Sequence, residues 1–302
     1  MQKLSSLDLV EALQLARAVA RLHDRGLLTS LSQPRTAEEL AKKHRVDVVI
    51  LRGTLDYIAA RTNLVRKQGD RFVATRHYDA ASKFLLDVYA LAYGGPGVDR
   101  RRLARAFKSA SPSGALPAII RQLGFNHVLD LGCGSGSLLV ALARDDPHFV
   151  GWGIELDPAM CKVARANVRT ARVAGRVKIF RGDAMRPKIR AGVQAVVASQ
   201  LANEMFGSGT ARVIAWLRRV RRAFPDRPLL IADYYGRLGT GRRTGRETLL
   251  HDFIQLISGQ GVPPADRKEW QRLYDAAGCR LVHVIEDTHT TLFVHLVVLS
   301  TA

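Results

Sequence analysis

The sequence has few cysteines, no long apolar run and comparatively few acidic residues. Its three cysteines, Cys133, Cys161 and Cys279, lie far apart in a chain of 302 residues. This spacing excludes a CxxC zinc site, and the odd number argues against a disulfide framework. No segment reaches the roughly 18 consecutive apolar residues of a membrane span, and the N-terminus lacks the apolar stretch of a signal peptide. We therefore expect a cytoplasmic protein without a membrane-spanning helix.

Basic residues outnumber acidic ones, 46 to 27, which gives a formal net charge of +19. Such a basic chain raises the hypothesis of a nucleic-acid partner. Residues 1–112 carry 20 Lys and Arg against 11 Asp and Glu, and residues 113–302 carry 26 against 16, so the excess is spread over both parts. Short basic clusters such as residues 218–222 are more often a solvated helix face than a binding patch. The charge leaves nucleic acid open as a partner without favouring it.

The first 112 residues are typical of a small helical domain with a β-hairpin. Thr36 followed by Glu39 predicts a capping box that begins a helix. The expected elements are an amphipathic helix over 6–29 with Gly26 as its stop, helices over 37–44 and 48–60, and two short strands within 63–75 around a polar turn. This order indicates a winged helix, whose second helix can read DNA. The other interpretation is a domain for dimerisation and for covering a substrate.

A small, polar stretch at residues 109–114 separates this domain, 1–112, from a second domain, 113–302. From about residue 115 the sequence alternates between strands and helices, which predicts an α/β fold with a mostly parallel sheet covered on both faces. The expected strands are 127–131, 149–154, 177–180, 193–199, 228–235, 280–286 and 291–299.

A glycine-rich turn follows the first of these strands. Asp130 lies near the end of the strand, and Gly132, Gly134 and Gly136 follow before a helix begins. Glycines are needed where the chain turns sharply and where a ligand must lie against bare backbone. The spacing GxGxG differs from the GxGxxG of nicotinamide-binding proteins, and no Lys-Ser or Lys-Thr pair follows as in a P-loop.

The run VLDLGCGSGSLL resembles the first motif of the class I S-adenosylmethionine (SAM)-dependent methyltransferases. Two further motifs stand where that family has them. Glu155 ends the second strand, and a carboxylate there can accept hydrogen bonds from both ribose hydroxyls. Asp183 and Ala184 follow the third strand, and the resemblance places Asp183 by the adenine amine and the adjacent backbone by the ring. With Ser199, which ends the fourth strand, and Asp130 and the three glycines, these residues form the expected SAM site.

The same resemblance covers nearly the whole chain. It implies a Rossmann-like, seven-stranded, mostly parallel sheet that ends in an antiparallel C-terminal hairpin. The pattern of residues 36–75 resembles the N-terminal domain of the small-molecule O-methyltransferases, which forms a dimer and roofs the active site. The resemblance therefore implies a homodimer that methylates a small molecule, in bacterial natural-product metabolism. An RNA methyltransferase and a winged-helix regulator that senses SAM without catalysis are the alternatives.

The sequence departs from the plant-type O-methyltransferases after the fourth strand. Asn203 and Glu204 stand near the place where that group has a catalytic His-Asp pair. This departure weakens a simple phenol O-methylation hypothesis. Glu204 and His251 remain the candidates for a general base, with Asp252 beside His251 as the third candidate catalytic residue.

The pair His251-Asp252 also suggests a metal site. Together with His289, in the turn between the last two strands, the pair would form a His-Asp-His set suited to Fe(II), zinc or a similar divalent ion. His283 and His295 compete with His289 for the third place. The set resembles the metal-dependent α-keto acid C-methyltransferases, in which the metal favours the enolate that attacks the SAM methyl group. Without a metal, His251 would act as a plain general base.

Overall fold

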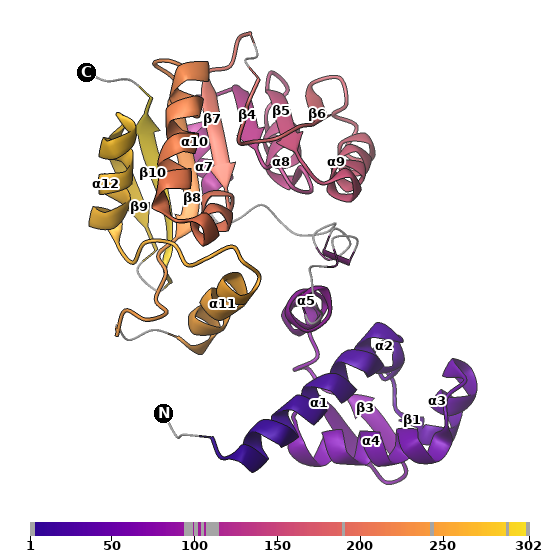
Figure 1. Ribbon diagram of the computed structural model, residues 1–302. Helices are drawn as coiled ribbons and strands as arrows, with labels where there is room; N and C mark the ends of the chain where they lie inside the picture. The colour runs from indigo at the N-terminus through magenta and orange to yellow at the C-terminus, as the bar shows by residue number, and fades with distance from the viewer. Residues whose placement is uncertain are drawn as a thin grey trace. The chain divides into compact units, whose positions relative to one another are not determined.

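The computed structural model describes residues 4–93, 99, 102–103, 106, 115–188, 191–241, 245–287 and 290–299. The chain divides into two compact units, Met1–Ala106 and Phe107–Ala302 (Figure 1). The boundary expected at residue 112 lies outside the described residues. Among those residues, none of the helices combines the length and the apolar character needed to cross a bilayer.

The N-terminal unit is helical, with a small antiparallel sheet of order β1-β3-β2. Gly26, with φ of 71°, ends the first helix, so that the helix expected over 6–29 is in fact two. The expected winged-helix order is present, and strand β1 was not predicted. The elements are α1 (Ser6–Asp24), α2 (Leu27–Ser30), β1 (Arg35–Thr36), α3 (Ala37–His44), α4 (Val48–Arg61), β2 (Val65–Gln68), β3 (Arg71–Ala74), α5 (Ala80–Leu85) and the π-helix η1 (Leu86–Ala92).

The capping box predicted at the start of α3 is confirmed. The backbone N–H of Glu39 donates to the Thr36 hydroxyl, and the backbone N–H of Thr36 donates to the Glu39 carboxylate, both at 3.2 Å. These two bonds satisfy amide groups that the first turn of a helix leaves without an intrahelical partner. The unit has its own core, in which Leu28, Leu55 and Phe72 are buried.

The C-terminal unit alternates strands and helices as expected. All seven expected strands are present, whereas helix α7 and the 3₁₀ segment η3 were not predicted. The elements are α7 (Leu116–Gln122), β4 (His127–Leu131), α8 (Ser137–Asp145), β5 (Val150–Glu155), α9 (Pro158–Thr170), β6 (Val177–Arg181), β7 (Ala195–Ser199), η3 (Ala202–Ser208), α10 (Thr210–Ala223), β8 (Pro228–Tyr234), α11 (Arg246–Ile257), α12 (Arg267–Ala277), β9 (Arg280–Glu286) and β10 (Leu292–Val298).

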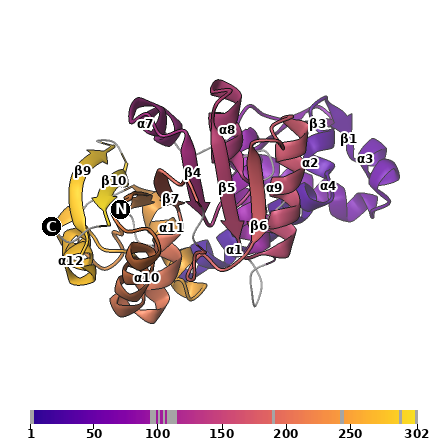
Figure 2. The same cartoon turned by 90° about the horizontal axis from the view of Figure 1, so that it is seen from above.

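The seven strands form one sheet of order β6-β5-β4-β7-β8-β10-β9 (Figure 2). Strands β6, β5, β4, β7 and β8 are parallel, and β10 lies antiparallel between β8 and β9. The predicted Rossmann-like sheet with an antiparallel C-terminal hairpin is therefore confirmed. Because the five parallel strands end at the same edge of the sheet, the residues that follow them gather there.

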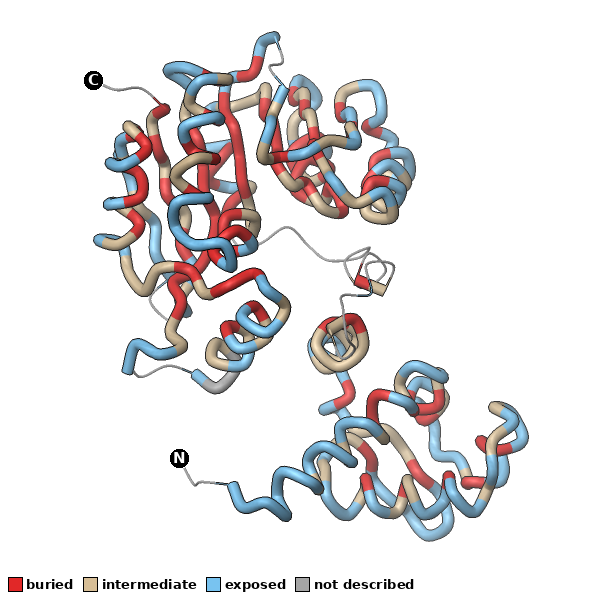
Figure 3. The backbone as a smooth tube through the Cα atoms, viewed as in Figure 1, coloured by how far each residue is buried: buried red, intermediate tan, exposed pale blue. Residues whose placement is uncertain are grey.

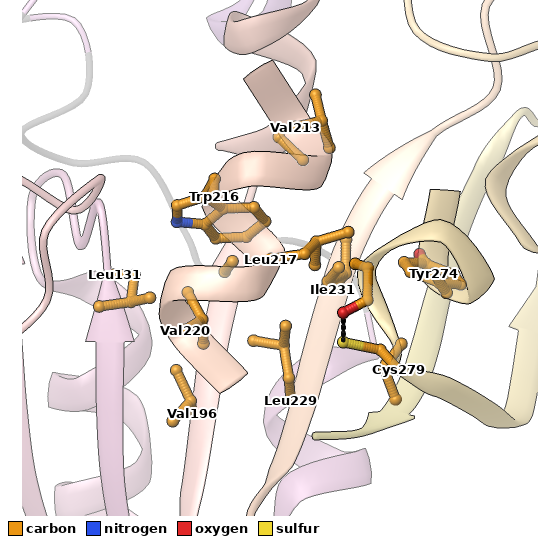
Figure 4. Close-up of a cluster of buried hydrophobic side chains, with 14 of the residues drawn as sticks. Leu131, Val196, Val213, Trp216, Leu217, Val220, Leu229, Ile231, Tyr274 and Cys279 are labelled. Carbon is orange, nitrogen blue, oxygen red and sulfur yellow. Dashed lines mark hydrogen bonds between the residues drawn. The ribbon is translucent and has the colours of Figure 1, made fainter. Parts of the chain in front are cut away.

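Both faces of the sheet are covered by helices. Helices α7, α8 and α9 bury Ile120, Leu139 and Ala164 against one face, and α10 and α12 cover the other. The tube of Figure 3 shows the central strands buried and the outer sides of α10 and α12 exposed. The apolar residues of α10 recur at helical spacing and contact the sheet, as Figure 4 shows for Val213, Trp216, Leu217 and Val220 above Val196, Leu229 and Ile231.

A chain of polar groups crosses the core between β8, β10 and α12. His295 of β10 is fully buried. Its Nδ1 lies 2.8 Å from the Tyr274 hydroxyl and its Nε2 lies 3.0 Å from the Tyr235 hydroxyl, which also donates to Glu286 at 2.6 Å. Burial lowers the pKa of His295 to about 3. The imidazole is therefore neutral at physiological pH, with both ring nitrogens occupied.

Replacing His295 should change how the stability of the protein depends on pH. The folded pKa of about 3 lies below the unfolded value of 6.5, so the unfolded chain binds the extra proton between these values. The wild type should therefore lose up to about 1.4 kcal/mol of stability per pH unit from this group as pH falls below 6.5. We expect the stability difference between wild type and His295→Gln, measured by urea unfolding, to narrow from pH 7 to pH 4. A pH-independent difference would contradict this assignment.

Candidate active site

The glycine turn lies at the carboxyl end of β4. Gly132, Gly134 and Gly136 have φ of 71°, 53° and 72°, a left-handed conformation that glycine adopts without strain. The N–H groups of Gly132 and Cys133 both donate to the Ile154 carbonyl, at 2.8 and 3.0 Å, which ties the turn to β5. A Cβ on Gly132 would come within 2.9 Å of Leu201, so a side chain there would collide.

Glu155 joins the glycine turn to the start of the next helix. One carboxylate oxygen accepts from the Gly134 N–H at 3.0 Å, and the other accepts from the Asp157 N–H at 2.8 Å. Asp157 in turn caps α9 by accepting from Ala159 and Met160 at 2.8 and 2.9 Å. The carboxylate predicted to bind the ribose therefore lies directly against the backbone of the glycine turn.

Asp130 is a buried acid beside the same turn. Its side chain is 2% exposed, and its Oδ1 has no hydrogen-bond partner among the residues that the structure describes. Burial, with the nearby Glu155 charge, raises the pKa of Asp130 to about 8. Buried polar atoms nearly always have a partner, so this unpaired carboxyl oxygen could bond to a group of a bound ligand. A ligand with positive charge and hydrogen-bond donors would fit it.

The segment after β6 is bonded to the same site. The Gly182 N–H donates to the Glu155 carbonyl at 2.9 Å. The exposed Asp183 accepts from the Met185 N–H at 2.8 Å. The Ala184 carbonyl accepts from the indole of Trp216 at 3.1 Å, which fixes this backbone against α10. The predicted residues Asp130, Glu155 and Asp183 thus lie on neighbouring segments, and half-buried Ser199 ends β7, the strand on the other side of β4.

Asp233 is a buried acid that the sequence analysis missed. It lies near the end of β8 and is 1% exposed, and it accepts from the N–H groups of Asn203 at 3.1 Å and Tyr234 at 2.9 Å. Burial is the main cause that raises the pKa of Asp233 to about 7. Glu204, next to Asn203 in η3, is exposed. The available signal was an acid near the end of a strongly apolar strand, whereas Asp130 was identified by the glycine run that follows it.

His251 and Asp252 lie on α11, which follows β8. Asp252 is fully buried, and its Oδ2 accepts from the N–H groups of Arg237 at 2.6 Å and Leu238 at 2.8 Å. Its Oδ1 is without a partner in the described part of the chain. The His251 ring packs edge-to-face on Tyr234 with 4.9 Å between centroids, and burial lowers its pKa. A neutral imidazole of this kind can accept a proton.

The predicted metal set is only partly described. His289 lies outside the described residues, His283 is exposed on β9, and both ring nitrogens of His295 face tyrosine hydroxyls. Across the described ranges, no three His, Cys, Asp or Glu side chains are grouped so that they could hold a metal ion. The structure brings together His251 and Asp252, and the three-ligand site stays a prediction.

Comparisons with known proteins agree with this geometry. Residues 128–223 match the family model described as "Methyltransferase domain". A tRNA1(Val) (adenine(37)-N6)-methyltransferase of Porphyromonas gingivalis is 28% identical over 197 residues, which cover 64% of this chain and 66% of that protein. The chain thus spans just under two thirds of the length of that relative.

The fold resembles solved structures over nearly its whole length. The mitomycin 7-O-methyltransferase superposes with a TM-score of 0.74 at 19% identity and covers 96% of each chain. An O-methyltransferase from neocarzinostatin biosynthesis, solved with SAM and a naphthoic acid, gives a TM-score of 0.69 at 17% identity and covers 94% of each. Residues 128–223 thus match a methyltransferase domain, and the C-terminal unit has the fold of these solved methyltransferases.

The raised pKa of Asp130 predicts a stability effect in the protein without ligand. The folded pKa of about 8 exceeds the unfolded value of 3.8, so the native state holds the extra proton between these values. Stability should fall from this cause as pH rises, by up to about 1.4 kcal/mol per unit. Asp130→Asn has no carboxyl group to titrate and so avoids this loss. The free energy of unfolding of the variant, measured in urea, should therefore rise relative to that of the wild type between pH 5 and pH 8. Asp233 titrates in the same direction but is present in both proteins, and a constant difference would refute the assignment.

Proposed function

We propose that the chain transfers the methyl group of SAM to a small-molecule acceptor. The observation that carries the proposal is the unpaired, buried oxygen of Asp130 beside the glycine turn and Glu155. A cationic amino-acid group would satisfy the acid, and a ribose would satisfy the carboxylate of Glu155. SAM contains both groups on one molecule.

The residues that would hold SAM come from the ends of four consecutive strands, β4 to β7. Glu155 would exchange its bonds with backbone N–H groups for bonds from the ribose hydroxyls. Asp130 would face the positive charge, while Asp183 and the Ala184 backbone would contact the adenine. Ser199 would close the site on the side of β7. When bound, SAM supplies a methyl group that is already activated by its sulfonium, so the chain needs to align the acceptor and exclude water.

Three buried side-chain oxygens lack hydrogen-bond donors. They support a methyl-accepting molecule that carries N–H or O–H groups. The side-chain oxygens Asn203 Oδ1, Asp252 Oδ1 and Gln255 Oε1 all lack hydrogen-bond partners among the described residues, although each residue is at most 7% exposed. Asp252 and Gln255 are three residues apart on α11 and thus share a face. Groups of this kind are nearly always satisfied in a folded protein, so a bound molecule with donors suits them.

The elements that carry these atoms are bonded to one another. The Asn203 N–H donates to Asp233 on β8, and the Gly207 N–H donates to the Gln260 carbonyl, just after α11, at 2.5 Å. A Cβ on Gly207 would overlap the carbonyl oxygen of Gly259, so the two backbones are in direct contact. His251, on this same helix, is the general base that we propose for the acceptor, with Glu204 as the second candidate.

We further propose that the protein is a homodimer acting in natural-product metabolism, in the cytoplasm. Helix α1 supports the dimer because it exposes several large apolar side chains, including Leu7 at 77% and Val10 at 56%. Exposed apolar side chains clustered on one helix commonly mark a protein interface. The O-methyltransferases of mitomycin and neocarzinostatin biosynthesis, which have this fold, support the metabolic role.

Glu155→Gln should weaken SAM binding while the protein stays folded. Each charge-assisted bond to the ribose contributes about 1.5–3 kcal/mol, so the Kd for SAM should rise on the order of tenfold or more. Isothermal titration with SAM measures this, and methyl transfer to a panel of phenols, amines and α-keto acids measures turnover. Glu38→Gln, which alters an exposed carboxylate on α3, is the matched control and should bind SAM as the wild type does. A wild-type protein that does not bind SAM would overturn the proposal.

Metal-dependent C-methylation of an α-keto acid is the second candidate, favoured by the unpaired Asp252 Oδ1 next to His251. It predicts nearly stoichiometric iron, zinc or a similar metal in the purified protein, and loss of that metal in His251→Ala. Elemental analysis of both proteins is the measurement. A wild type that binds SAM but contains no metal, even after purification with added Fe(II), would leave His251 as a metal-free base.

A further inference from the structure

A shallow basic cleft, open to solvent, lies between helix α10 and the segment that follows β6. Its volume is about 510 Å³, and its lining residues are Arg186, Pro187, Lys188, Arg219, Arg222 and Ala223. Four of these six residues are basic and none is acidic. All four basic side chains are exposed, and none of them forms an ion pair with any residue that the structure describes.

The four arginines at the end of α10 fall into two pairs with different surroundings. Arg218 donates to the Ala276 carbonyl at 2.7 Å and Arg221 donates to the Gly278 carbonyl at 2.9 Å, so this pair fastens α10 to the end of α12. Arg219 and Arg222 are also three residues apart, but they line the cleft. Like charges at this spacing repel each other on a helix. Arg219 and Arg222 are exposed, as expected for a solvated helix face, and they also border the cleft.

Irregular chain, and no helix of the described residues, borders this flank of α10. The connection from β6 to β7 crosses the face of the sheet that α10 covers, and Figure 1 shows it passing in front of β5 and β4. Parallel strands are usually joined by a crossover helix. Here the described residues of the connection, 182–188 and 191–194, form only turns and irregular chain. Arg186 and Lys188 are thus brought to face α10 across an open space.

The chemistry of the lining selects a phosphate-bearing ligand. Guanidinium groups bind phosphate oxygens through paired, charge-assisted hydrogen bonds, and a lysine adds a compact charge. Four positive charges around one space exceed what a single carboxylate or sulfate would neutralise. Pro187 and Ala223 offer apolar surface to the rest of a ligand. We propose that this cleft binds a small molecule that carries a diphosphate group.

The proposed site is distinct from the SAM site and does not depend on the proposed methyl transfer. Helix α10 begins after β7 ends and itself ends at Ala223, shortly before β8 begins at Pro228. Arg219 and Arg222 therefore lie toward the amino ends of the strands, whereas the glycine turn and Glu155 lie at the carboxyl ends. The Arg219→Gln/Arg222→Gln variant should leave SAM binding unchanged, and that measurement also verifies its folding.

Titration of the whole protein with inorganic pyrophosphate at low ionic strength tests the proposal. The double variant Arg219→Gln/Arg222→Gln should raise the Kd for pyrophosphate on the order of tenfold or more. Arg186→Gln/Lys188→Gln, on the opposite wall, should do the same. The control Arg169→Gln/Arg172→Gln removes the same charge, at the same spacing, from exposed positions at the end of α9, and should keep the wild-type Kd.

Three results would overturn the proposal. The first is a wild type whose affinity for pyrophosphate is no higher than that of the two cleft variants. The second is an equal loss in the α9 control, which would mean that the effect follows net charge alone. The third is a single-stranded RNA oligonucleotide that binds much more tightly than pyrophosphate and loses affinity in the cleft variants, which would assign the cleft to a nucleic-acid backbone instead.

Discussion

The carboxylate and backbone of Glu155 hold together the segments on which the candidate active site depends. Its side chain accepts from the glycine turn and from the start of α9, and its carbonyl accepts from Gly182 after β6. A single residue at the end of β5 therefore sets the positions of three chain segments that belong to different βα units. Because these bonds use the carboxylate that we propose for the ribose, binding of SAM there would require the turn to rearrange.

The buried acids of the described chain lie at this edge of the sheet or on the helix that follows β8. Asp130, Asp233 and Asp252 are each at most 2% exposed. Asp130 lies near the end of β4, Asp233 lies near the end of β8, and Asp252 lies on α11, the helix after β8. Burying a carboxylate is unfavourable unless bonds or charges compensate for it. Asp233 is compensated on both oxygens by backbone N–H groups, whereas Asp130 and Asp252 each keep one unpaired oxygen. These two unpaired oxygens lower the stability of the folded protein, and bound molecules that donate hydrogen bonds to them would offset the loss.

Much of the fold could be predicted from local sequence. The strand from His127 to Leu131 and the glycine turn were visible because apolar runs, glycine spacing and capping residues act over a few positions. Contacts between residues that are distant in the sequence could not be predicted from such local patterns. The bond between Asn203 and Asp233, 30 residues apart, needs η3 and β8 to be adjacent. The division of the α10 arginines could not be predicted either, because residues at i and i+3 reveal their roles only when the position of α12 is known.

The backbone contact between Gly207 and the loop after α11 restricts how this protein can change. No side chain fits between these two segments, and an inserted residue in either would displace α11 together with His251 and Asp252. New specificity in α/β enzymes commonly arises through changes in loop length. This loop cannot change its length without displacing α11. Descendants of this chain that accept other molecules would have to change the side chains on the inward face of α11 while keeping the length of its connection. Related sequences with altered acceptors should therefore keep the length of this connection.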